Sequence, residues 1–353
     1  MMDDMSRSQS HSTPALAVVG SFSFDSVLTL DGRAVTGKVG GNALWSALGA
    51  RAAGIAPRVL TIVGRGYPAH VLPALADAGL DVQRVVRIDE PHPVRVTFAH
   101  LPGGGRLQPV PEDLLVSFPA EVRGQFIDTT TTPEILGRGA PQDHHVPAEW
   151  LDEVDGWHLP LLPLVRHRSV VGRLRDARGY LQTDCPARSD LIGDPYGRMA
   201  PTATDIDVFL PSTSDIDVID PGTSSHDVVA RLRTVGSSTV VVKSGAEGSL
   251  VVVGDTAWRV PAHPGEPIDP TGAGDAFCGG FLVGMLRSGD HVEAAALGSA
   301  VASFAVATED PLDLIAVDAA EVESRAAELL RRVRRADDDD TRRALASAQE
   351  GLS

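Results

Sequence analysis

The chain has 353 residues and a net charge of −16, with 47 acidic against 31 basic residues. This length is sufficient for one large α/β domain. Because a surface with this much negative charge would repel a phosphate backbone, nucleic acid is not expected as a partner. Two cysteines are too few for a disulfide framework, and no apolar run approaches the roughly 20 residues that span a bilayer. These properties predict a cytoplasmic protein that is not bound to a membrane.

Short β-rich runs alternate with helical stretches along most of the chain. Apolar runs such as residues 17–19 and 240–242 suit parallel strands that are covered on both faces. The alternation predicts an α/β fold with a doubly wound, mostly parallel central sheet flanked by helices, and with ligands at the carboxyl ends of the strands. We expect strands at 15–20, 27–30, 58–63, 94–99, 207–210, 239–242 and 250–253, and helices at 42–53, 69–78, 167–177, 226–235, 276–286, 291–307 and 319–334.

Three regions fall outside this alternation. Residues 1–14 are polar and lack the apolar core of a signal peptide, which predicts a disordered leader before a domain of residues 15–335. Within that domain, residues 25–39 and 91–135 do not fit a βαβ unit and predict a small β lid over the site. Residues 336–353 contain a run of four aspartates and predict an acidic linker and tail.

A carboxylate and then a glycine pair follow the first predicted strand. Asp25 is placed at the carboxyl edge of the sheet, where it either accepts hydrogen bonds from a sugar diol or closes a turn. Gly40 and Gly41 precede Asn42 at the start of the first predicted helix. The simpler interpretation makes Asn42 an N-cap, and the functional one gives the glycine amides a substrate contact.

Two local patterns resemble known sites but lack their context. Residues 32–39 resemble a P-loop but end in Val39, where a P-loop needs a hydroxyl group and an immediate helix. His144 and His145 are adjacent, so they point in different directions, and no second ligand cluster accompanies them. The absence of G-x-G-x-x-G after the first strand disfavours an NAD-dependent oxidoreductase.

The most restrictive motif is the run Asp-Pro-Thr-Gly-Ala-Gly-Asp-Ala-Phe at residues 269–277. Gly272 and Gly274 at the start of an apolar helix leave backbone N–H groups open beside the positive end of the helix dipole, which predicts an anion site. Asp275 would repel a bound phosphate unless it takes a proton from a hydroxyl group that attacks a phosphoryl group. The simpler alternative is an aspartate that only complements the dipole. We favour a phosphotransferase site.

This run resembles the C-terminal signature of the ribokinase-like (PfkB) carbohydrate and nucleoside kinases. In that family the final aspartate is the catalytic base and the Gly-Ala-Gly turn is the anion hole. The resemblance therefore implies these catalytic roles for Asp275, Gly272, Ala273 and Gly274. It extends to the N-terminal half, where it implies that Asp25, Gly40, Gly41 and Asn42 bind the acceptor.

The sequence departs from the family pattern at two places. Trp45 stands where many sugar kinases of the family carry an asparagine that contacts the sugar, so it either packs in the core, which we favour, or stacks on a substrate ring. Ser212 and Asp215 stand where the family has an Asn-x-x-Glu motif that orders Mg²⁺. The shorter pair predicts weakened support for the metal.

Residues 243–248 read as a hairpin turn with glycine at positive φ, and by position they resemble the nucleotide loop of the family. Asp269 and Thr271 match positions that bind a monovalent cation in related enzymes, which leaves K⁺ open as a cofactor beside ATP and Mg²⁺. The implied nucleotide contacts are Lys243, Ser244, Gly245, Gly248 and Thr271.

We therefore predict an ATP-dependent carbohydrate kinase that phosphorylates a hydroxyl group of a small sugar or sugar-like acceptor, with Asp275 as general base. An adenosine-type nucleoside kinase is the alternative that Trp45 suggests. A sugar- or nucleotide-sensing protein with weak turnover is the alternative that Ser212 and Asp215 suggest. An edge strand of the lid would offer a surface for a homodimer.

Overall fold

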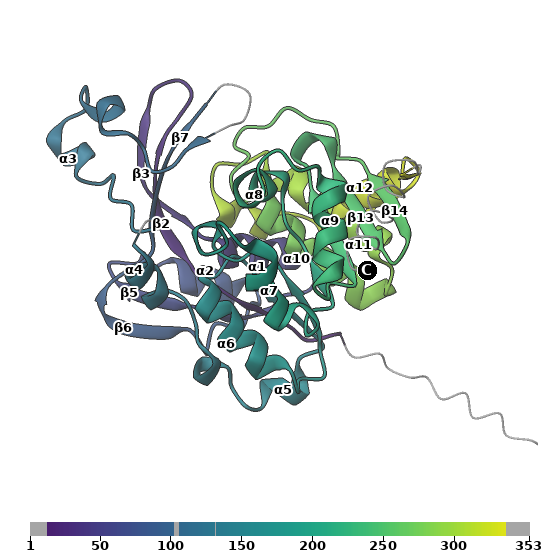
Figure 1. Ribbon diagram of the computed structural model, residues 1–353. Coiled ribbons are helices and arrows are strands. Elements are labelled where there is room, and N and C mark those ends of the chain that lie inside the picture. Colours follow the sequence, from purple (N-terminus) through teal and green to yellow (C-terminus); the bar gives the residue numbers. More distant parts are fainter. Residues whose placement is uncertain (1–12, 102–105, 131, 337–353) are drawn as a thin grey trace, which may run out of the picture.

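The computed structural model describes residues 13–101, 106–130 and 132–336 (Figure 1). The predicted leader and the predicted acidic tail therefore lie outside the described residues, apart from residues 13, 14 and 336. No helix within the described ranges is both long and apolar enough to cross a membrane.

The centre of the molecule is a nine-stranded sheet. The strands from β4 to β12 run parallel to one another, and the strands from β12 to β15 pair antiparallel. The prediction of a doubly wound, mostly parallel α/β sheet is confirmed. In spatial order the strands are β15 (Arg334–Arg335), β14 (Thr256–Val260), β13 (Ser249–Val253), β12 (Thr239–Lys243), β11 (Val208–Phe209), β10 (Tyr180–Thr183), β9 (Gly156–Leu159), β1 (Leu16–Val19) and β4 (Arg58–Leu60).

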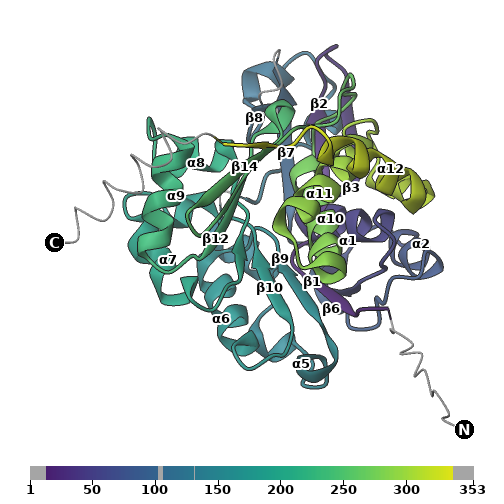
Figure 2. The same ribbon diagram turned by 90° about the vertical axis from the view of Figure 1, so that its right-hand side faces the viewer.

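Helices cover both faces of this sheet. Figure 2 shows α1, α10, α11 and α12 on one face and α6, α7, α8 and α9 on the other. The helices are α1 (Asn42–Ala52), α2 (Val71–Asp77), α3 (Ala120–Arg123), α4 (Pro133–Arg138), α5 (Trp150–Glu153), α6 (Leu164–Leu174), α7 (Pro195–Ala203), α8 (Thr213–Ile219), α9 (Ser225–Thr234), α10 (Ala273–Ser288), α11 (His291–Ala305) and α12 (Ala319–Leu330).

The valines of strand β12 are buried on both faces of the central sheet. Val241 packs into the apolar cluster that contains Phe281 of α10, and Val240 and Val242 pack into the cluster that contains Val228 of α9. Successive side chains of a strand point to opposite faces, so a run of apolar residues is needed where both faces are covered.

A second sheet stands beside the main one and is formed by the two segments predicted to make a lid (Figure 1). Its order is β3 (Ala34–Gly40), β2 (Ser23–Leu28), β7 (Arg95–His100) and β8 (Arg106–Leu107). The P-loop-like run at residues 32–39 lies in the turn and strand β3 of this sheet, rather than in a strand-to-helix loop. A small sheet pairs β5 (Ile62–Arg65) with β6 (Val86–Pro91).

Three expectations about the elements were wrong. The single strand expected at 58–63 is divided at Thr61, because β4 joins the main sheet while β5 pairs with β6. Thr61 lies between the two strands, and its hydroxyl group accepts a hydrogen bond from Phe22 N. The central strands β9 and β10 were not predicted. Asn42 is not the N-cap of α1, because Gly41 occupies the cap position with φ of 103°.

Candidate active site

The candidate residues converge at the carboxyl ends of parallel strands β1, β9, β10, β11 and β12. Asp184 directly follows β10, Ser212 follows β11 shortly after its last residue, and Lys243 is the last residue of β12. Helices α1, α8 and α10 begin at the same edge of the sheet. Helix α10 packs closely on α1 at Gly279, which has no side chain. A Cβ placed on Gly279 would lie only 2.0 Å from Ser46 O, so a larger residue would not fit there.

The Gly-Ala-Gly-Asp turn forms the start of α10. Gly272 is the N-cap residue in the left-handed conformation, with φ of 77°, and Gly274 is exposed. The N–H of Ala273 donates to Pro270 O at 3.3 Å within the turn, whereas the N–H of Gly274 has no acceptor among the described residues. Asp275 lies in the first turn of α10 and is half-buried. An exposed amide at the positive end of a 16-residue helix is suited to bind an anion.

The side chain of Trp45 packs against Gly272 of this turn. Its side chain is buried, and a Cβ placed on Gly272 would lie 2.2 to 2.3 Å from three atoms of the indole ring. The residue at position 272 therefore contacts the face of the ring directly. This packing agrees with the core role that we favoured for Trp45.

The acceptor residues implied by the resemblance lie together at the ends of β2 and β3. Asp25 is buried on β2, and a Cβ placed on Gly40 would lie 2.2 Å from Asp25 Oδ2. Gly41 has a positive φ, and a Cβ placed on it would lie 2.5 Å from Ser21 O. Asn42 accepts a hydrogen bond from Ser21 N at 3.1 Å and donates to Leu161 O at 2.7 Å, so its amide joins the loops that follow β1 and β9.

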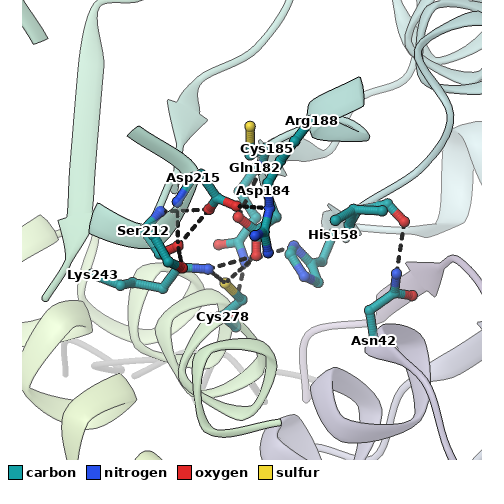
Figure 3. A network of polar contacts seen from close by, with 12 residues as sticks. Asn42, His158, Gln182, Asp184, Cys185, Arg188, Ser212, Asp215, Lys243 and Cys278 are labelled. Atoms are coloured by element: carbon teal, nitrogen blue, oxygen red, sulfur yellow. Dashed lines mark hydrogen bonds and ion pairs between the residues drawn. The ribbon is translucent and has the colours of Figure 1, made fainter. Parts of the chain in front are cut away.

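Lys243 lies behind the turn at the start of α10 and is buried. Its Nζ donates to Asp184 Oδ2 at 2.5 Å and to Cys278 Sγ at 3.4 Å, and it would lie 3.7 Å from a Cβ placed on Gly274 (Figure 3). Burial alone would lower the pKa of Lys243, but the negative charge of Asp184 outweighs this effect and holds the pKa above its usual value. Lys243 therefore places a permanent positive charge beside Gly274.

Ser212 and Asp215 form a capping box at the start of α8. The Ser212 hydroxyl accepts from Asp215 N at 3.2 Å, and Asp215 Oδ2 accepts from Ser212 N at 2.8 Å. The other oxygen of Asp215 pairs with Arg188 Nε at 2.9 Å. Both carboxylate oxygens are thus occupied by protein donors, and the pair does not fit a role as direct Mg²⁺ ligands.

The predicted nucleotide loop is a hairpin turn between β12 and β13. Ser244 and Gly248 bracket a short 3-10 turn, Gly245–Glu247, and Ser244 N donates to Gly248 O at 2.7 Å. Gly245 and Gly248 both have positive φ, as the turn pattern predicted. Gly248 also lies against β14, where a Cβ would meet Val260 O at 2.0 Å.

Asp269 and Thr271 lie directly before the turn that starts α10. Asp269 is buried, and its Oδ1 accepts a hydrogen bond from Thr271 N at 2.8 Å. Its carboxylate also contacts Lys38 and His100 of the second sheet.

Sequence reasoning missed four residues of this region: Asp184, Arg188, Lys38 and His100. Asp184 and Arg188 lie after β10, which was not predicted, so their position at the carboxyl edge of the sheet could not be recognised. The sequence does contain a feature that could have indicated Asp184. The polar residues 182–184 end a short β-rich segment, and polar site residues often follow a strand of a parallel sheet in this way.

The fold with this arrangement at the carboxyl ends of its strands is that of the ribokinase-like proteins. The structure is similar to that of the ribokinase from Thermotoga maritima, with a TM-score of 0.66 and 20% sequence identity over 89% of this chain and 99% of that one. Residues 187–314 match the model of the pfkB family carbohydrate kinases.

Relatives with assigned names include nucleoside kinases and an inositol 3-kinase. The cytidine kinase of Thermococcus kodakarensis is 27% identical over 80% of this chain and 92% of its own length. A nucleoside kinase of Methanothermobacter thermautotrophicus is 42% identical over 78 residues, which are 22% of this chain and only 25% of that protein. The chain is thus similar to carbohydrate and nucleoside kinases of the ribokinase-like (PfkB) family.

Proposed function

We propose that this protein transfers the γ-phosphoryl group of MgATP to a hydroxyl group of a small sugar-like acceptor. The observation that carries the proposal is the start of α10, where the exposed residue Gly274 precedes Asp275 in the first helical turn and the ammonium group of the buried Lys243 lies 3.7 Å from the Cβ position of Gly274. Donors to the transferring phosphoryl group and a carboxylate beside them are what this reaction requires of a protein.

Each group has one task in this scheme. Asp275 accepts the proton of the acceptor hydroxyl as it attacks the γ-phosphorus. The amides at the start of α10 and the ammonium group of Lys243 stabilise the charge on the phosphoryl oxygens, while the hairpin turn at residues 244–248 lies along ATP. Asp25 binds the acceptor through its hydroxyl groups, beside the backbone of Gly40 and Gly41.

Mg²⁺ enters this scheme as part of the substrate MgATP. The carboxylate of Asp215 pairs with Arg188 and accepts a hydrogen bond from Ser212 N at the start of α8. Its contribution in this scheme is therefore to position that helix and to add negative charge near the metal. Direct coordination by Ser212 and Asp215 is not part of the proposal.

The second sheet acts as a lid in this proposal, since closure excludes water that would otherwise accept the phosphoryl group. Its outward side chains also support self-association through the lid. Exposed apolar residues gather in the segments that form it or flank it, namely Leu30, Leu107, Leu114, Val116 and Ile127. Sedimentation of the wild type and of Leu30→Asp would test this homodimer, which is expected to weaken in the variant.

The test of the kinase is ADP release from MgATP against a panel of pentoses, hexoses and nucleosides. Asp275→Asn serves as the blank, and it is expected to lose on the order of 10²–10⁴-fold in kcat with little change in stability. Equal turnover in the variant would remove Asp275 as the base. A folded wild type that binds ATP but never releases ADP across the panel would count against transfer to these acceptors.

A nucleoside acceptor is the second candidate, and the match to the cytidine kinase over nearly its whole length favours it. Stacking of the base on Trp45 does not support this candidate, because Trp45 is buried under Gly272. Comparison of kcat/KM for cytidine and for free ribose would distinguish the two acceptor classes.

A sensing protein with weak turnover is the third candidate, supported by the Ser212–Asp215 pair that is occupied by Arg188. It predicts ATP binding without phosphoryl transfer at any Mg²⁺ concentration. Replacing Ser212 with Asn and Asp215 with Glu would then be expected to raise turnover.

A further inference from the structure

Asp269 is the point where the lid meets the catalytic segment. Lys38 on β3 reaches across 231 positions of sequence, and its Nζ lies 3.2 Å from Asp269 Oδ2. His100, at the end of β7, places Nε2 3.5 Å from Asp269 Oδ1. The three side chains expose only 17%, 12% and 6% of their surface, so the contact is largely removed from water.

These contacts do not fit the monovalent cation that the family resemblance implies at Asp269. Oδ1 already accepts from Thr271 N, and Oδ2 faces the ammonium group of Lys38. Residues 308–312 follow the helix predicted to end at residue 307, and the family resemblance implies the remaining cation ligands there. This segment is also engaged, because Thr308 Oγ1 bonds to the Asp313 carboxylate and accepts from Asp310 N. A potassium ion at this carboxylate would have to share it with a positive charge that is already present.

The ionisation of Asp269 agrees with a compensated charge. Burial would raise the pKa of this carboxyl group, but the hydrogen bonds from His100 and Thr271 and the charge of Lys38 outweigh burial, so its pKa lies below the usual value. The positive group that lies beside this carboxylate is the ammonium group of Lys38, which belongs to the protein.

The composition adds an independent argument. The chain has 31 basic residues, of which only two, Lys38 and Lys243, are lysines. Both contact a buried carboxylate next to the start of α10. A lysine differs from an arginine in carrying a compact point charge, which is the property that a bound alkali ion also has.

We propose that the ammonium group of Lys38 takes the place of a monovalent cation at Asp269, so that the catalytic turn of this kinase needs no potassium. The inference rests on the proposed phosphotransferase function. Asp269 fixes the corner at Pro270 through Thr271 N, and this corner leads directly into Gly272. Because Lys38 belongs to the lid, the positive charge reaches Asp269 together with the lid strand.

The test replaces potassium with tetramethylammonium at equal ionic strength and measures both MgATP affinity and thermal unfolding. The wild type is expected to change less than about twofold in affinity. Lys38→Met removes the internal cation, so it is expected to bind MgATP about tenfold more weakly or worse without potassium, and to recover when potassium is added. Arg33→Met removes an exposed charge from the same lid and is expected to respond as the wild type does.

Several outcomes would overturn the inference. A wild type that potassium activates several-fold, or a thallium ion found beside Asp269 in wild-type crystals, would show that Lys38 does not occupy the site. A folded Lys38→Met variant that is indifferent to potassium would show that Asp269 needs no cation. If Lys38→Met does not fold, Lys38→Gln and the thallium experiment decide. Because MgATP binding and thallium occupancy need no acceptor, these results stand apart from failure to find kinase turnover.

Discussion

Replacement of Gly272 by alanine is expected to damage the turn at the start of α10 through two separable effects. The left-handed conformation of this residue, with φ of 77°, costs an alanine about 1–2 kcal/mol. The new methyl group would also lie 2.2 Å from the ring of Trp45, and overpacking of this kind costs about 1–3 kcal/mol. The variant should therefore lose about 2–5 kcal/mol of unfolding free energy if the turn stays in place.

The same helix supplies the matched control. Gly289 caps the other end of α10 with φ of 68°, but no atom lies within 4 Å of its Cβ position. Gly289→Ala should therefore show only the conformational cost of about 1–2 kcal/mol. Urea unfolding followed by circular dichroism measures both variants, and the excess for Gly272→Ala reports the clash with Trp45.

A double-mutant cycle isolates that contact. In a Trp45→Leu background the ring is absent, so the cost of Gly272→Ala should fall to the value found at Gly289. If the turn shifts instead of enduring the clash, kcat should fall on the order of 10²-fold, as for the loss of one donor to a developing charge. A Gly272→Ala variant no less stable than Gly289→Ala, with unchanged kcat, would refute the packing of Gly272 on Trp45.

Three further results are expected. Gly40→Ala would force Asp25 aside and should weaken acceptor binding by about 10–100-fold, with the KM for ATP little changed, whereas Gly172→Ala, with nothing near its Cβ position, should leave both KM values as they are. Lys243→Met leaves Asp184 as an uncompensated buried charge and should cost about 3–5 kcal/mol in urea unfolding, most of which Asp184→Leu in the same chain should restore. Burial, aided by Arg168, lowers the pKa of His167 to about 4, so the unfolded chain binds more protons and stability falls as pH drops below 6.5. At pH near 5 this effect is about 2 kcal/mol, and His167→Leu should lose that much less than the wild type between neutral pH and this pH; an identical loss in both would contradict it.

The parts of the fold that the sequence revealed are those with a strong local signal. The valine run of β12 is apolar over consecutive positions, and α10 is apolar all around, so both were recognised without tertiary information. Strands β9 and β10 were missed because they are four residues long and carry polar side chains such as His158 and Gln182. These two side chains are buried and lie within hydrogen-bonding distance, at 3.2 Å, a pairing between strands that no local pattern reports.

The candidate site shows the same division. The glycines and Asp275 were predictable because a helix start imposes a local pattern. The pairing of Lys243 with Asp184, and of Lys38 with Asp269, joins residues 59 and 231 positions apart. Such contacts depend on strand order, which sequence periodicity does not encode.

The short strand β15 has a consequence for how the molecule behaves in solution. Arg334 and Arg335 pair with Arg259 and Trp258 of β14, and both arginines are exposed. Two charged residues thus close an edge of the nine-stranded sheet that would otherwise offer unpaired amides to another chain. A polypeptide that ends at Leu330 would keep the helices and the candidate site but lose this protection, so its failure in a binding experiment would reflect edge-to-edge aggregation rather than a missing ligand contact.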